Sequence, residues 1–101
     1  MIIEEQCYTL KPCSVALYYQ DYNPRGLRIQ VRILGNFIGC FHTDLDQIIH
    51  LWGYDSLADR EHRRSLLDAD REWQEYQKQS SDFIVRMESR ILYPAPFSPL
   101  K

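Results

Sequence analysis

The clearest hydrophobic pattern in the chain covers residues 47–54, Gln-Ile-Ile-His-Leu-Trp-Gly-Tyr. Successive side chains of a strand point to opposite faces, and both faces of this segment are mostly apolar. We therefore predict a strand that is covered on both sides. Ser56 follows it, and Asp59 comes three residues later. This spacing is typical of a helix whose N-cap is Ser56.

Three more strands and one earlier helix follow from the same criteria. Alternating or apolar runs predict strands over residues 2–10, 37–43 and 83–93. One helical face is formed, with spacings of three and four residues, by Val15, Tyr18, Tyr19 and Tyr22. The Asn-Pro-Arg-Gly run at residues 23–26 predicts that this helix ends or kinks there.

Two segments allow more than one interpretation. Residues 27–34 alternate apolar and polar positions as a strand does, yet Leu27, Val31 and Leu34 also share a helical face. After Ser56, a charged run that is typical of a solvated helix face leads either to one long helix or to two helices with a kink near Asp70. The polar residues 77–82 are predicted to end that helix.

The predicted order is strand, helix, strand, strand, helix, strand. This order favours an α+β fold, a ferredoxin-like βαββαβ unit with a four-stranded antiparallel sheet and helices on one face. The other face is also apolar, and a second copy of the chain is the simplest cover for it. The proline-rich tail, residues 94–101, excludes regular structure, and its apolar side chains favour contact with a surface.

Length and composition limit the function. The 101 residues make one domain, residues 1–101, and a domain this small buries little of its surface, so a subunit partner would stabilise it. The net charge of −2, with no cluster of Lys or Arg, argues against nucleic acid, and no apolar run is long enough for a membrane span. An acidic N-terminus and three cysteines without metal-ligand spacing indicate a cytoplasmic chain with reduced thiols, and we expect no metal or other cofactor.

Four stretches of the chain together resemble the NIPSNAP family. They are Tyr8-Thr9-Leu10-Lys11-Pro12, Leu34-Gly35-Asn36, the run from His50 through Trp52 and Tyr54 to Arg60, and the ending from Arg90 to Leu100. The resemblance implies a dimeric α+β barrel, in which two ferredoxin-like sheets face each other. It also implies that residues 27–34 are helical. Small single-domain members of the family resemble proteins of unassigned activity, so catalysis stays an open question.

The candidate pocket residues are aromatic, histidine or arginine side chains that could contact a small apolar or aromatic ligand. They are His50, Trp52, Tyr54, His42, Tyr8 and Arg32. His50 could act as a general acid or base, or it could be a core histidine hydrogen-bonded to a tyrosine. Glu4 could supply a pocket group, but a solvated or dimer-rim position is the other interpretation. The sequence thus predicts a homodimeric ligand-binding or protein-interaction module; the alternatives are a small cofactor-independent enzyme and a haem protein that uses His42 or His50.

Overall fold

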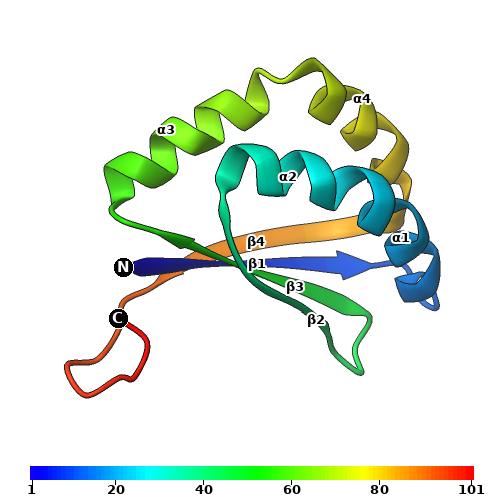
Figure 1. Ribbon diagram of the computed structural model, residues 1–101. Helices are drawn as coiled ribbons and strands as arrows, with labels where there is room; N and C mark the ends of the chain where they lie inside the picture. The colour runs from blue at the N-terminus through cyan, green and yellow to red at the C-terminus, as the bar shows by residue number, and fades with distance from the viewer.

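Four antiparallel strands form one sheet, and every helix lies on the same side of it (Figure 1). The computed structural model describes residues 1–101 apart from the side chain of Ser81. The elements in chain order are β1 (Ile2–Leu10), α1 (Val15–Asp21), the π-helical turn η1 (Tyr22–Gly26), α2 (Leu27–Leu34), β2 (Asn36–His42), β3 (Gln47–Tyr54), α3 (Leu57–Asp68), α4 (Arg71–Ser80), the 3-10 turn η2 (Ser81–Phe83) and β4 (Ile84–Leu92). The strand order β2-β3-β1-β4 confirms the predicted ferredoxin-like α+β fold.

The first helical layer is continuous from α1 through η1 to α2 (Figure 1). Residues 27–34 are helical, with Ile29, Gln30 and Leu34 buried. The predicted kink falls in η1, which contains Pro24. Proline lacks the N–H that an α-helix needs, and π-helical turns are a common cause of kinks. The wider turn therefore lets the chain change direction without ending the helix.

The second helical layer is two helices that break at Asp70. Ser56 is the N-cap of α3, since its Oγ accepts a hydrogen bond from the Asp59 amide at 3.1 Å, as predicted. The Asp70 carboxylate in turn accepts from the Trp73 amide at 2.9 Å and begins α4. The prediction that residues 77–82 end the helix is wrong over its first part. The helix continues to Ser80, because Ser80 extends the buried stripe of Trp73 and Tyr76.

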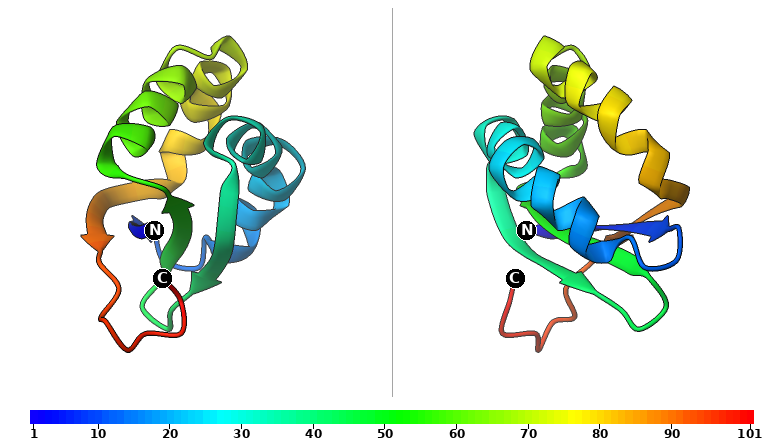
Figure 2. Two further views of the ribbon diagram at one scale, coloured as in Figure 1. Left: turned by 60° about the vertical axis from the view of Figure 1, so that its left-hand side comes forward. Right: turned by 90° about the vertical axis from the view of Figure 1, so that its right-hand side faces the viewer.

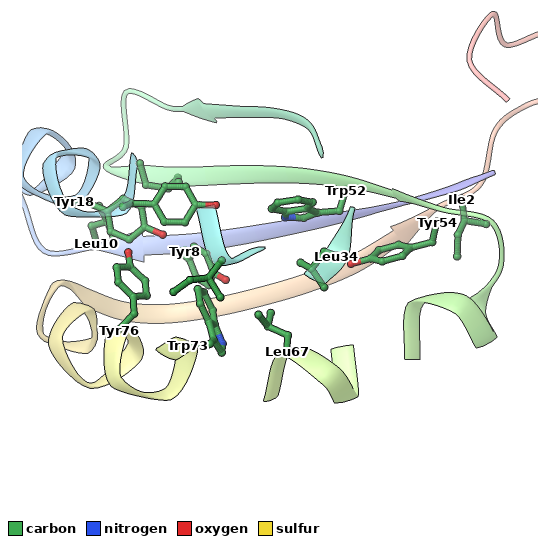
Figure 3. Packing of buried hydrophobic residues seen from close by; sticks show 13 residues of the cluster. Ile2, Tyr8, Leu10, Tyr18, Leu34, Trp52, Tyr54, Leu67, Trp73 and Tyr76 are labelled. Atoms are coloured by element: carbon green, nitrogen blue, oxygen red, sulfur yellow. The ribbon is translucent and has the colours of Figure 1, made fainter. Parts of the chain in front are cut away.

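The two faces of the sheet differ sharply. The face under the helices holds an aromatic-rich core (Figure 3). Its buried hydrophobic members are Ile2, Tyr8, Leu10, Tyr18, Tyr22, Ile29, Leu34, Ile48, Trp52, Tyr54, Leu67, Trp73 and Tyr76. On the opposite face, which we call the open face, no described helix covers the apolar side chains; they are Ile3, Phe41, Ile49, Leu51 and Leu92. Figure 2 shows the helices on one side of the sheet only.

Candidate functional site

A cavity of about 750 Å³ opens between the first helical layer and strand β2. Its lining residues are Ala16, Tyr19, Gln20, Tyr22, Asn23, Leu27, Cys40 and His42. No Asp, Glu, Lys or Arg is among these residues, and aromatic rings, an aliphatic side chain, amides and a thiol make up the wall. The volume lies in the range typical of small-molecule sites, which is roughly 300–1,000 Å³.

A tyrosine–histidine pair forms part of the wall. The Tyr19 hydroxyl lies 3.0 Å from His42 Nδ1, and the two rings meet edge to face at 5.6 Å. Burial raises the pKa of Tyr19 to about 12, so its hydroxyl keeps its proton and can donate it to Nδ1. The direction of this hydrogen bond depends on the His42 tautomer, because a hydroxyl can donate or accept. Burial also raises the pKa of the Cys40 thiol, which keeps this thiol uncharged.

His50 lies behind the cavity wall and is completely buried. Its Nδ1 is 3.1 Å from the Tyr22 hydroxyl, and its Nε2 is 3.3 Å from the Tyr18 hydroxyl. Tyr22 also donates a hydrogen bond to Gln30 Oε1, an atom that can only accept. The single Tyr22 hydrogen is thus used, and Tyr22 must accept from Nδ1–H. These contacts assign the Nδ1–H tautomer to His50, with Nε2 accepting from Tyr18.

Burial lowers the pKa of His50 to about 4. The imidazole is therefore neutral at physiological pH, and both ring nitrogens have hydrogen-bond partners. A molecule in the cavity contacts the ring of Tyr22, which lines it, while Tyr22 separates that molecule from His50. His50 therefore matches one of the two interpretations that the sequence allowed, a core histidine hydrogen-bonded to a tyrosine.

A second buried polar cluster crosses the sheet beneath α3. The Glu4 carboxylate is fully buried and accepts from Arg60 Nε at 2.9 Å, from Ser89 Oγ at 3.0 Å and from the Tyr54 hydroxyl at 3.5 Å. Glu4 is thus neither solvated nor at a rim. The next residue on this face, Gln6, bonds to the Arg64 guanidinium at 2.9 Å when its amide oxygen faces that group. The alternating pattern of a strand could not predict that Arg60 pairs with Glu4 or that Arg64 pairs with Gln6.

The six residues predicted for a pocket fall in three places. His42 lines the cavity, and His50 and Tyr8 lie behind it with ring centroids 5.2 Å apart. Trp52 and Tyr54 lie farther along β3, under the helices and away from the cavity (Figure 3). Arg32 lies on the outer side of α2, where it pairs with Asp70 at 3.0 Å. The cavity residues that the sequence did not single out for a pocket include Tyr19, Leu27 and Cys40, which no local motif marks.

The described residues contain no group of three or more His, Cys, Asp or Glu side chains placed to hold a metal ion. None of their helices combines the length and the apolar character that crossing a membrane requires.

Comparison with known proteins identifies the family. The chain is 44% identical to a NIPSNAP family protein from Agrobacterium tumefaciens, with a TM-score of 0.94 and coverage of 99% of this chain and 98% of that one. It is 40% identical to Protein NipSnap homolog 2 of Danio rerio over 99% of this chain and 35% of that protein. The chain spans between 35% and 41% of the length of the curated relatives it matches.

A putative antibiotic biosynthesis monooxygenase from Nitrosomonas europaea shares the fold, with a TM-score of 0.67 over 96% of this chain and all of that one, but only 9% of the sequence. The NIPSNAP family model matches residues 3–99, and the chain belongs to the NIPSNAP family.

Proposed function

We propose that the protein is a homodimer that binds a small, neutral, largely apolar molecule in the cavity between the first helical layer and β2. The observation that carries this proposal is the chemistry of the cavity wall, which offers rings and hydrogen-bonding groups but no carboxylate, lysine or arginine. A charged ligand would lose its hydration there without gaining a counter-charge, which is costly. A neutral ligand loses much less.

The rings in the wall favour an aromatic ligand. Tyr19, Tyr22 and His42 present faces and edges that can pack against a planar molecule. Uncharged polar groups close to them, such as the amides of Gln20 and Asn23, can orient one hydrogen-bonding group of that molecule.

We propose binding rather than catalysis through His50. A general base needs access to the proton that it removes, and it works best with a pKa near the operating pH. His50 has neither property, because Tyr18 and Tyr22 occupy its two nitrogens and burial lowers its pKa to about 4. Its role in this proposal is to hold Tyr22 in place as the back wall of the cavity.

The open face supports the homodimer. Ile49 and Leu51 on β3 are only half-buried there, and Phe41 on β2 is 56% exposed. The charged groups on the same face are already neutralised in pairs, Arg90 with Glu5 at 2.7 Å and Arg86 with Glu88 at 3.2 Å. A second copy could therefore cover this face without burying net charge. A reducing compartment such as the cytoplasm would suit the three free cysteines.

A native mass spectrum tests ligand and dimer together. We expect twice the 12.1 kDa chain mass, plus the mass of a bound small molecule. Ala16→Trp should abolish the bound mass, because an indole ring on the cavity wall would take up part of the space that the ligand needs. The matched control is Leu17→Trp, which changes a neighbouring exposed residue outside this cavity and should keep the ligand.

Four outcomes would contradict the proposal. A wild-type dimer with no bound molecule would show that the cavity is not a ligand site. The same conclusion would follow if the Ala16→Trp variant still carried the ligand. A wild-type monomer would remove the dimer. An absorbance band near about 400 nm would identify haem instead. Its ligand would then be His42, because both nitrogens of His50 are engaged within the described structure.

A further inference from the structure

The C-terminal tail folds into a hook, which we define as residues 93–101. After β4 the chain turns back on itself, and the Ser98 amide donates to the Ala95 carbonyl at 2.9 Å. The Ser98 hydroxyl donates to the Leu100 carbonyl at 2.8 Å. Figures 1 and 2 show the hook on the side of the sheet away from the helices, which is the side of the open face.

The hook exposes an unusual amount of apolar surface. Phe97 is 89% exposed, Tyr93 is 65% exposed and Leu100 is 46% exposed. The hook also borders a hollow of about 390 Å³ whose other lining residues are Met1, Ile3 and Leu92. Ile3 and Leu92 are cross-strand partners on the open face, so the apolar surface of the hook is continuous with that face.

Contacts within one protomer leave the apolar side chains of the hook largely uncovered. Fixing a backbone residue costs conformational entropy, and the net gain from an exposed hydrogen bond is small. The prolines at positions 94, 96 and 99 lower the entropy of the free tail, but they give Phe97 no contact. An almost fully exposed ring that adjoins an uncovered apolar face indicates that another surface packs against it.

We propose that the hook clasps a second copy of the chain, with Phe97 packed against the open face of its partner. This inference rests on the proposed homodimer. In a two-fold symmetric dimer each hook makes the same contact, so one side chain contributes twice to the interface. The continuity of hook and open face is the reason to name a second copy, rather than an unrelated protein, as the occupant.

The test compares Phe97→Ser with Leu66→Ser in the full-length protein. Leu66 is also an exposed apolar residue, but it lies on α3, on the other side of the sheet. We expect Phe97→Ser to raise the dimer dissociation constant at least about 10-fold, as for the loss of an aromatic anchor. Leu66→Ser should leave it within about 2-fold, and sedimentation velocity over a dilution series would measure both constants.

A photoreactive phenylalanine analogue at position 97 locates the contact directly. Dimers mixed from isotopically light and heavy chains should give crosslinks between chains to the β3 peptide, residues 47–54. If Phe97→Ser left the dissociation constant of a stable dimer unchanged, or if crosslinks formed only within one chain, the clasp would be refuted. The proposed dimer itself would not be affected by either result. A monomeric wild type would overturn the dimer itself. A crosslink to a different protein would assign the hook to that partner and refute the clasp.

Discussion

Replacement of Arg60 by methionine should destabilise the protein by about 3–5 kcal/mol, the usual cost of removing one partner of a buried ion pair. Glu4 is fully buried, and the Arg60 guanidinium contacts its Oε2 through Nε at 2.9 Å and Nη2 at 2.5 Å. Without Arg60 the carboxylate keeps its hydrogen bonds to Ser89 and Tyr54 but loses its counter-charge. We therefore expect a loss near the lower end of that range, measured by urea unfolding.

A double-mutant cycle separates the charge effect from lost packing. Glu4→Gln removes the carboxylate while retaining the side-chain shape, so the double variant Glu4→Gln with Arg60→Met leaves no unpaired charge. The double variant should be more stable than Arg60→Met alone. If the two sites were independent, the second substitution would lower the stability further. If Arg60→Met cost less than about 1 kcal/mol, Glu4 would not be the fully enclosed carboxylate that the structure shows.

Acid should destabilise the protein through His50 as the pH falls below about 6.5. The pKa of His50 is lowered from 6.5 to about 4 in the folded protein. Between these values the unfolded chain binds the proton that the folded chain excludes, so stability is complete above pH 6.5 and falls as the pH falls toward 4. At about 1.36 kcal/mol per pH unit, the loss amounts to about 3 kcal/mol.

The neighbours of His50 should not distort this pH dependence. Tyr8, Tyr18, Tyr22 and Cys40 surround it, and burial raises the pKa of each, so all stay neutral in this window. His50→Gln should flatten the stability curve between about pH 4 and 6.5, whereas His62→Gln, at an exposed site on α3, should leave it unchanged. An equal slope in wild type and His50→Gln would refute a neutral, enclosed imidazole.

Local patterns predict most of the fold because they act over a few residues. Ser56 and Asp59 mark a helix start on their own, and the kink at Pro24 follows from the chemistry of proline. Residues 27–34 were ambiguous for a physical reason. The buried positions of α2 are Ile29, Gln30 and Leu34, while Val31 is 41% exposed. The strand pattern and the proposed helical face therefore each match the burial only in part.

The site was less predictable because its contacts come from distant segments. His50 was singled out as a lone polar residue in an apolar strand, but its tyrosine partners lie on two other elements, α1 and η1. Glu4 is a charged residue on the buried face of β1, and its partner Arg60 is 56 residues away. The cavity itself depends on how the first helical layer lies over β2, which no sequence spacing encodes.

The central claim, a neutral aromatic-binding cavity, is tested most directly by titrating the protein with naphthalenes that carry neutral, anionic or cationic substituents. We predict that neutral 2-naphthol binds at least about 10-fold more tightly than naphthalene-2-carboxylate or 2-naphthylmethylammonium, because the wall offers no counter-charge to either ion. Amide shifts in NMR spectra should cluster at Tyr19, Leu27 and Cys40. Tighter binding of either ion, or shifts confined to the open face, would contradict the account.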